Sequence, residues 1–291
     1  MKILVTGATG FIGKHLVNTL KEKHEIYVLV RPSSDKTNFD PFFCFDNNIP
    51  VLHEYLLEHQ IEGIIHLASL VLVSHKDTDI ENLIESNIFL GAAILEATLN
   101  TGVKWFLNTG TFWQHYEPDT QDYHPVNLYA ATKQAFIDMA KYYVEVSGIK
   151  FVTLKICDTF GPDDTRAKIF SLWNNIAQTG EILSMSKGEQ EIDILYIDDV
   201  ISGFVHLIGL LNSNEELKPD YALCAEKRYT LKELADLYEN ATGKQLNIRW
   251  GERPYRIREV MVPWKAGTKL PGWKPEVSII DGILKIGEAN L

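Results

Sequence analysis

Short apolar runs alternate with stretches of helical periodicity along the first 160 residues. An apolar run without polar alternation indicates a strand buried on both faces, whereas apolar residues three or four apart indicate an amphipathic helix. The apolar runs predict strands at residues 3–5, 26–30, 42–45, 63–67, 103–108 and 150–156. The helical patterns lie at residues 15–20, 52–59, 80–100 and 127–147. Strands that alternate with helices in this way predict an α/β fold with a doubly wound parallel sheet of the Rossmann type.

The pattern changes after Phe160, where Gly161 and the residues that follow it interrupt the alternation. Further elements are predicted at residues 166–180, 193–197 and 231–242. We expect residues 1–160 to form the Rossmann domain and residues 161–291 to form mainly a smaller substrate-binding lobe. Strand segments near 193–200 are expected to return to the first domain. Ligands of open α/β sheets bind at the carboxyl ends of the strands, so the lobe is expected to complete a pocket there.

Three glycines connect the first predicted strand to the first helix, in the sequence VTGATGFIG. Gly7 permits a sharp turn, Gly10 leaves room for a diphosphate to approach the backbone, and Gly13 lets the helix pack closely on the strand. The helix N-terminus offers unpaired N–H groups to phosphate. This context predicts a dinucleotide-binding turn. The other cofactor-binding candidates in the turn are Thr9, Phe11 and Ile12.

Arg31 directly follows the second predicted strand, 24 positions after Gly7. An acidic residue at this place would hold the ribose 2′-hydroxyl of NAD, whereas arginine suits the 2′-phosphate of NADP. A solvated surface arginine is the alternative interpretation. We therefore expect NADP(H) to be preferred, with NAD(H) possible. The remaining cofactor-binding candidates are Asp46, Leu67 and Ala68.

Tyr129 and Lys133 lie four residues apart at the start of the helix predicted at 127–147, and so they share one helix face. A phenol is a poor acid–base group at its ordinary pKa near 10. A neighbouring ammonium favours the phenolate and is expected to bring the pKa toward neutral pH. The strand before this helix ends in hydroxyl residues, Thr109 and Thr111. The group predicts an acid–base site at the carboxyl edge of the sheet.

Composition and charge exclude several classes of ligand and location for this chain. The chain has 291 residues and a formal net charge of -11, which argues against a general nucleic-acid binder and still permits a basic pocket for a phosphorylated ligand. Cys44, Cys157 and Cys224 are far apart and odd in number, so we expect free thiols in a reducing cytoplasm, with neither a disulfide framework nor a metal site. The first strand begins too early for a signal peptide, and no apolar run reaches the ~20 residues that cross a membrane.

These features together resemble the extended short-chain dehydrogenase/reductase family, which contains nucleotide-sugar epimerases, dehydratases and reductases. The resemblance runs nearly end to end. Its glycine motif matches the three glycines, its strand-four signature matches His66, Leu67 and Ala68, and its Tyr-x-x-x-Lys pair matches Tyr129 and Lys133. The resemblance implies an NAD(P)-dependent oxidoreductase or epimerase that acts on a nucleotide sugar.

The family also implies a catalytic hydroxyl. Its Ser or Thr precedes a Val-Tyr-Gly-like element, which is Phe112, Trp113 and Gln114 in this chain, so the role falls on Thr109. Because Gln114 matches the glycine imperfectly, Thr111 remains a second candidate.

Three departures from the family pattern change the expected chemistry. The Asp-Glu pair that dehydratases use is replaced by Gly110 and Thr111, which argues against dehydration. Ile192 replaces an arginine that would contact the nucleotide phosphates, and Asp158 replaces an asparagine. Phosphate binding is therefore expected to depend on other cations, although each of them is equally compatible with a solvated surface position. The substrate-binding candidates are Thr111, Asp158, Arg166, Lys168, Arg256 and Arg258.

Several short sequence segments, including NTGTFWQHY and GEQEIDILYIDDV, resemble those of a narrower group within the family, the CDP-3,6-dideoxyhexose synthases. This resemblance implies that NADPH reduces the 4-keto group of CDP-4-keto-3,6-dideoxyglucose. Thr109 would hydrogen-bond the ketone, Tyr129 would protonate it, and Lys133 would hold the nicotinamide ribose. The alternatives are an NAD-dependent nucleotide-sugar 4-epimerase and a non-catalytic redox sensor that binds NADPH. The base of the nucleotide and the stereochemistry at C4 stay open.

The helices predicted at 80–100 and 127–147 carry apolar residues on more than one face. One apolar stripe covers the sheet, and the second needs a partner. In the resembled family these helices pair across a two-fold axis, which implies a homodimer built on a four-helix bundle. The alternative is that loop 70–79 covers the second stripe within one chain.

Overall fold

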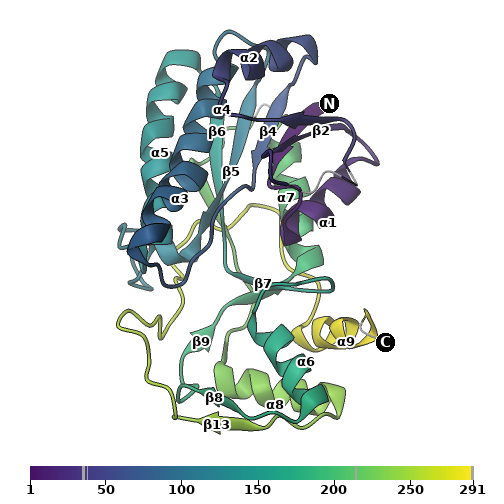
Figure 1. The fold of residues 1–291 in the computed structure, drawn as a ribbon, viewed down its shortest axis with the longest axis vertical. Helices are drawn as coiled ribbons and strands as arrows, with labels where there is room; N and C mark the ends of the chain where they lie inside the picture. The colour runs from purple at the N-terminus through teal and green to yellow at the C-terminus, as the bar shows by residue number, and fades with distance from the viewer. Residues whose placement is uncertain (35–36, 38, 214, 290–291) are drawn as a thin grey trace.

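The computed structural model describes residues 1–34, 37, 39–213 and 215–289. Its centre is a seven-stranded sheet in the order β11-β6-β5-β4-β1-β2-β3 (Figure 1). All pairings in this sheet are parallel. The strands are β1 (Lys2–Thr6), β2 (Glu25–Val30), β3 (Phe42–Cys44), β4 (Gly63–His66), β5 (Trp105–Thr111), β6 (Lys150–Ile156) and β11 (Asp220–Leu223). The predicted Rossmann-type parallel sheet is confirmed.

Helices cover both faces of the sheet, which explains why its strands read as continuous apolar runs. On one face lie α1 (Phe11–Leu20) and α7 (Ile197–Leu211), which pack against each other and the sheet in one buried cluster. The other face carries α2 (Ile49–Glu58), α4 (Leu90–Thr98) and α5 (Leu128–Ser147). The two faces therefore bury separate apolar clusters.

The helix predicted at 80–100 is interrupted. It consists of α3 (Ile80–Ile84), a π-helical turn η2 (Glu85–Phe89) and α4, and it follows a short 3₁₀ turn, η1 (Asp77–Asp79). A π-turn inserts one residue into the helical repeat and commonly occurs at functional sites. Here the turn contains Asn87, which is 1% exposed although it is polar.

The smaller lobe lies beyond the carboxyl ends of the central strands (Figure 1). Three two-stranded sheets pair β7 (Asp158–Phe160) with β10 (Ile194–Tyr196), β8 (Leu183–Met185) with β13 (Ile248–Trp250), and β9 (Glu191–Ile192) with β12 (Tyr229–Thr230). The other elements outside the central layers are η3 (Phe112–Gln114), α6 (Ile169–Thr179), α8 (Leu231–Thr242) and α9 (Ile279–Ala289).

The segment near 193–200 was predicted to return to the first domain, and its residues Ile194 and Ile197 share a buried cluster with β1 and α1. Its strand, β10, pairs with β7 and does not join the central sheet, whereas α7 and β11 do rejoin the sheet layers. The physical reason is that the chain continues from the carboxyl end of β6 into β7, beyond the central sheet, and β7 offers β10 a buried partner there. An apolar run of three residues does not indicate which sheet it will join.

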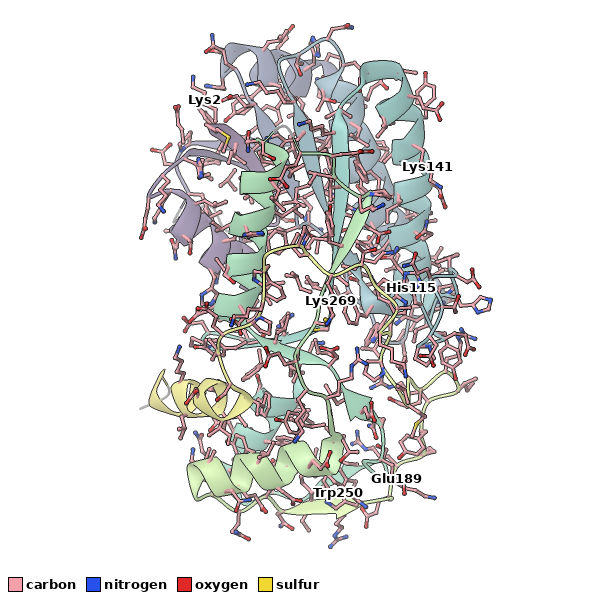
Figure 2. All side chains as sticks on the ribbon, turned by 180° about the vertical axis from the view of Figure 1, so that it is seen from behind. Lys2, His115, Lys141, Glu189, Trp250 and Lys269 are labelled. Carbon is pink, nitrogen blue, oxygen red and sulfur yellow. The ribbon has the colours of Figure 1, made fainter. Side chains whose placement is uncertain are left out.

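After β13 the chain runs back from the lobe to the sheet. Figure 2 shows Lys269 on this returning segment, well separated from Glu189 and Trp250 in the lobe. The segment is fixed by a hydrogen bond from the Ala222 N–H to the Thr268 carbonyl, with an N–O distance of 2.7 Å. Across the described ranges, no helix is both long and apolar enough to span a membrane.

Candidate active site

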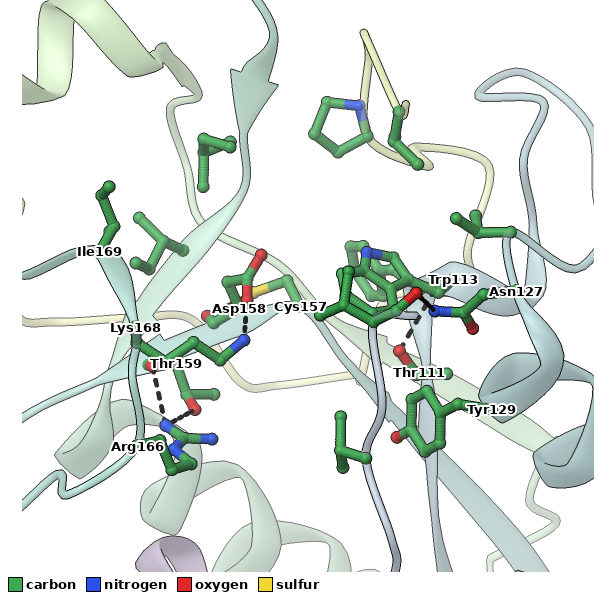
Figure 3. Close-up of a pocket in the computed structure, with 18 of the residues that line it drawn as sticks. Thr111, Trp113, Asn127, Tyr129, Cys157, Asp158, Thr159, Arg166, Lys168 and Ile169 are labelled. Carbon is green, nitrogen blue, oxygen red and sulfur yellow. Dashed lines mark hydrogen bonds and ion pairs between the residues drawn. The ribbon is translucent and has the colours of Figure 1, made fainter. Parts of the chain in front are cut away.

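A cavity of about 1280 Å³ lies between the carboxyl ends of the central strands and the lobe. Figure 3 shows Tyr129 and Thr111 on one side of it and Asp158, Lys168 and Arg166 on the other. Most of the residues predicted from the sequence line it: Gly7, Gly10, Phe11, Ile12, Gly13, Leu67, Thr109, Thr111, Tyr129, Lys133, Asp158, Arg166, Lys168, Arg256 and Arg258. The structure does not place four others in the lining: Thr9, Arg31, Asp46 and Ala68.

The turn after β1 leaves bare backbone at the cavity. Gly7 has a φ of +71°, and a Cβ built on it would lie 2.6 Å from the Ala68 nitrogen. A Cβ on Gly13 would lie 2.1 Å from the Gly7 carbonyl oxygen, so α1 can approach β1 this closely only with glycine there. Gly10 is the N-cap of α1 and its N–H bonds the Gly7 carbonyl at 3.0 Å. This turn fits the diphosphate of a dinucleotide at the helix N-terminus.

Residues at and just after the end of β4 are hydrogen-bonded to the end of β1, below the cavity. The Thr6 Oγ1 lies 2.9 Å from the His66 Nδ1 and accepts a hydrogen bond from the Ala68 N–H at 3.1 Å. Burial, reinforced by the nearby Lys133 ammonium, lowers the pKa of His66 to about 3. The imidazole is therefore neutral at physiological pH, and it joins β1 to β4 where Leu67 enters the cavity lining.

Tyr129 and Lys133 project from the first turns of α5, which Asn127 caps by accepting a hydrogen bond from the Ala130 N–H at 3.0 Å. Both side chains are buried, with exposed fractions of 8% and 1%. Burial lowers the pKa of Lys133 to about 8. Its Nζ has no hydrogen-bond partner among the described residues. An unpartnered buried amine that lines a cavity fits a polar ligand such as a ribose.

The phenol of Tyr129 differs from the prediction. Burial raises the pKa of Tyr129 to about 12, and hydrogen bonds with Ser69 and Thr111 only partly oppose this effect. The expected lowering by Lys133 does not offset the burial of the phenol, which is the largest cause of the shift. Tyr129 therefore keeps its proton at neutral pH and can donate it.

The structure separates the two candidate hydroxyls. The Thr111 Oγ1 accepts a hydrogen bond from the Trp113 N–H at 3.3 Å, whereas the Thr109 Oγ1 is buried with no partner in the described part of the chain. Both line the cavity, so each is available to a ligand. Sequence reasoning missed Ser69, a further hydroxyl residue that lines the cavity. Its only signal is its place directly after the strand-four signature, at the carboxyl edge of the sheet.

The predicted substrate-binding cations already have partners within the chain. Arg166 makes two contacts with the Asp164 carboxylate, at 2.7 and 2.8 Å, and its guanidinium lies 4.5 Å from the Phe11 ring centre. The Lys168 Nζ lies 2.7 Å from the Asp158 Oδ1 (Figure 3). These pairs fix the side chains at the cavity wall and reduce the net positive charge there.

Two more cations come from the segment that follows β13. The Arg256 Nε lies 3.7 Å from the Glu259 carboxylate, and the Arg258 guanidinium lies 4.2 Å from the Tyr116 ring centre. Arg253, which the sequence prediction omitted, also lines the cavity. The cavity thus has cationic groups from both the α6 side and the returning segment. No cluster of potential metal ligands occurs in the part of the chain that the structure describes.

Comparisons with known proteins agree with this arrangement. The profile of the NAD dependent epimerase/dehydratase family matches residues 3–221. A CDP-abequose synthase from Salmonella muenchen is 28% identical over 290 residues, covering 98% of this chain and 96% of that protein. Another from Yersinia pseudotuberculosis is 26% identical over 269 residues, covering 90% of this chain and 92% of that protein.

Solved structures show the same fold. The UDP-glucose 4-epimerase from Thermotoga maritima, solved with UDP-glucose, superposes with a TM-score of 0.85 at 22% identity and covers 100% of this chain and 98% of its own. The UDP-glucuronic acid 4-epimerase from Bacillus cereus, in complex with UDP-glucuronic acid and NAD, gives 0.84 at 21% identity, with coverages of 99% and 98%. At these identities the likeness establishes the architecture.

Proposed function

The chain belongs to the NAD dependent epimerase/dehydratase family, and we propose that it uses NADPH to reduce the 4-keto group of a CDP-linked deoxysugar. The observation that carries this proposal is the burial of Tyr129 and Lys133 in the wall of the cavity of about 1280 Å³ that the glycine turn also lines. The CDP-abequose synthases, which align over nearly the whole chain, support the choice of a CDP-sugar.

The proposed roles follow from position and protonation. The bound dinucleotide supplies the hydride. Gly7, Gly10 and Gly13 hold its diphosphate against the N-terminus of α1, and Lys133 binds the nicotinamide ribose with its unpartnered Nζ. Tyr129, whose raised pKa keeps it protonated, donates its proton to the ketone oxygen as negative charge develops there.

Thr109 and the cationic residues are assigned to the substrate. Thr109, whose hydroxyl has no partner among the described residues, is assigned to the ketone, and Thr111, whose hydroxyl opposes the rise in the Tyr129 pKa, is assigned to the phenol. Asp158 holds Lys168 in place at the wall. The phosphates of the substrate are assigned to the cations that line the cavity, in place of the family arginine that Ile192 replaces: Arg166, Lys168, Arg256 and Arg258.

The test is an assay with CDP-4-keto-3,6-dideoxyglucose and NADPH, followed by the loss of absorbance at 340 nm. We expect one equivalent of NADPH to be consumed for each ketone reduced. Interconversion of C4 epimers without net consumption of cofactor would favour the 4-epimerase alternative. Tight binding of NADPH without turnover of any nucleotide sugar would favour the redox sensor.

The cofactor preference gives a first prediction. Arg31 is exposed directly after β2, where a 2′-phosphate would be accessible to its guanidinium. Arg31→Asp is expected to weaken NADPH binding by about 10- to 100-fold relative to NADH, since hydrogen bonds to charged groups contribute ~1.5–3 kcal/mol. Dissociation constants for both cofactors, measured by nucleotide fluorescence, check this.

A matched control for this prediction is Arg249→Asp, which makes the same change of charge on the exposed part of β13. That variant is expected to leave the ratio of the two dissociation constants unchanged. Equal affinity of the unmodified protein for NADPH and NADH would contradict the preference.

The assembly gives a second prediction, a homodimer through helices 80–100 and 127–147, which lie on the same side of the molecule (Figure 1). Several apolar side chains on them are exposed: Ile80, Ile84, Met139, Tyr142 and Val146. These side chains are exposed in a structure that includes loop 70–79, which supports the dimer over the alternative that the loop covers them. Light scattering is expected to give twice the chain mass of 33.1 kDa.

The double variant Met139→Arg, Tyr142→Arg should shift this mass to that of one chain, because charges on the shared face oppose its burial. Val205→Arg, at an apolar position of α7 that is 37% exposed, is the matched control and should remain dimeric. A molar mass of one chain for the unmodified protein at micromolar concentration, measured by light scattering, would contradict the prediction.

A further inference from the structure

A second buried lysine, Lys155 on β6, lies outside the residues that line the cavity and is 5% exposed. Its Nζ lies 3.1 Å from the Asp220 Oδ2 and 3.0 Å from the His115 Nε2. His115, labelled in Figure 2, is 4% exposed, and its Nδ1 lies 2.9 Å from the Asp122 carbonyl oxygen. These polar contacts run from β11 across β6 to the loop after η3, and none of the four residues takes part in the proposed reaction.

The two contacts of the His115 ring fix its protonation state by geometry. The Asp122 carbonyl oxygen can only accept, so the Nδ1 must carry a hydrogen and donate it. A lysine ammonium can only donate, so the Nε2 must present its lone pair to Lys155. His115 is therefore neutral in the folded protein, with its hydrogen on Nδ1.

The face of this ring supports residues 253–264, here called the arginine segment, on their way from the lobe back to the sheet. The rings of His115 and Trp264 are stacked, with centroids 4.0 Å apart and an angle of 11° between their planes. The Trp264 Nε1 donates to the Thr120 carbonyl at 2.8 Å, and the Lys155 Nζ lies 5.0 Å from the centre of the indole ring. Trp264 is 2% exposed and lines the cavity, so its place depends on the ring beneath it.

The residue next to His115 contacts the same segment. The Arg258 guanidinium lies 4.2 Å from the Tyr116 ring centre. The other end of the arginine segment is fixed to the lobe, where the Arg253 N–H bonds the carbonyl of Met185 in β8 at 3.1 Å. Between these anchors lie the two arginines of the segment that are assigned to the substrate phosphates. The adjacent rings of His115 and Tyr116 therefore fix where this part of the segment lies against the cavity.

We propose that His115 is a positioning residue for substrate binding: its ring, fixed between Lys155 and Asp122, holds Trp264 and so keeps the arginine segment against the cavity. This proposal rests on the proposed function, in which that segment contacts the substrate phosphates. A second proton on His115 would lie on the Nε2, 3.0 Å from the Lys155 Nζ, and would replace a hydrogen bond with repulsion. Because Trp264 would lose its support, binding of a nucleoside diphosphate is expected to weaken as His115 becomes charged.

The charged groups around the ring determine the direction of this pH effect. Burial is the main cause that lowers the pKa of His115, and Lys155 adds to it. Asp122 and Asp220 act in the opposite direction, and the arginine segment presents the uncharged Trp264 to the ring. Lys155→Met removes the repulsion and leaves both carboxylates. The pKa of His115 should then rise, and the loss of affinity should begin at a higher pH.

The first test observes the imidazole directly and needs no substrate. Long-range ¹H–¹⁵N NMR spectra of histidine-labelled protein are recorded between about pH 5 and 8, and the His115 signals are assigned by their loss in His115→Phe. We expect a neutral ring with its hydrogen on Nδ1, and in Lys155→Met a titration at higher pH. A hydrogen on Nε2, or a His115 titration that Lys155→Met leaves in place, overturns the proposal.

The second test compares the affinities for CDP and NADPH by isothermal titration calorimetry. His115→Ala is expected to weaken CDP binding about tenfold with NADPH affinity nearly unchanged, because a stacked aromatic pair contributes an energy of that order. His115→Phe keeps a flat ring against Trp264, so it should restore most of the CDP affinity. His124→Ala removes an exposed histidine from the same loop, and this matched control should bind both ligands as the unmodified protein does.

The pattern of losses separates this inference from the proposed function. CDP binding that stays normal in His115→Ala overturns the positioning role of His115 and leaves the proposed function intact. An equal loss of CDP and NADPH affinity in this variant indicates a general loosening of the fold and also overturns the positioning role. An unmodified protein that binds no CDP contradicts both the proposed function and the inference.

Discussion

Tyr129→Phe is expected to lower turnover by about 10²–10⁴-fold, because it removes the only proton that the proposed mechanism transfers from the protein. The ring stays, so the packing around the 8% exposed side chain should be preserved. Affinity for NADPH should change little, since Lys133 and the glycine turn are intact. Steady-state kinetics with the keto sugar, together with NADPH titration, measure both effects.

The control for this prediction is Tyr142→Phe, the same substitution on the same helix at a position that is 63% exposed. Turnover of this variant should match that of the unmodified protein. Unchanged turnover in Tyr129→Phe would refute the proton-donor role. A parallel loss of NADPH affinity would instead indicate that the phenol supports the cofactor site.

The sheet was predictable because each of its main strands is a short, continuous apolar run in the sequence. The run IYVLV at residues 26–30 and the run GIIHL at 63–67 are buried on both faces, and the observed β2 and β4 differ from them by one residue at an end. The helix α7 was missed although it is long and its exposed positions, Asp198, Ser202, Val205 and Gly209, recur at helical spacing. Its role in covering the sheet depends on contacts with α1.

The interruption of the helix at 80–100 depends on a contact that no local pattern contains. Asn87 bonds to Leu70, which is 17 positions away in the chain. That contact accompanies a π-turn in a stretch whose apolar periodicity alone indicates a regular helix. A similar distance in sequence separates Ser69 from Asn87, to which its hydroxyl donates a hydrogen bond in the folded chain.

The sequence predicted most of the residues that line the candidate site, but it did not predict their protonation and ion pairing. The spacing of Tyr129 and Lys133 places them on one face, and both line the cavity. The sequence does not reveal how dry that face is, and so the direction of the Tyr129 pKa shift was wrong. Likewise, Lys168 is visible as a charge in the sequence, but its pairing with Asp158 is a property of the fold.

Gly13→Ala is expected to destabilise the fold and to weaken cofactor binding. The added Cβ would lie 2.1 Å from the Gly7 carbonyl oxygen and 2.6 Å from the Ala8 Cα, and both are backbone atoms that a rotamer change does not move. The helix α1 must shift away from β1, which costs about 1–3 kcal/mol by overpacking and displaces the N–H groups assigned to the diphosphate. Thermal unfolding and NADPH titration should both show the loss.

Gly209→Ala supplies a control of opposite sign. Gly209 lies in α7, it is exposed, and a Cβ built on it meets nothing within 4 Å. Because alanine restricts the unfolded chain and favours the helix, this variant should gain about 0.5–1 kcal/mol of stability and bind NADPH as before. If Gly13→Ala unfolds at the same temperature as Gly209→Ala and binds NADPH equally well, the close contact between α1 and β1 is not what holds the cofactor turn.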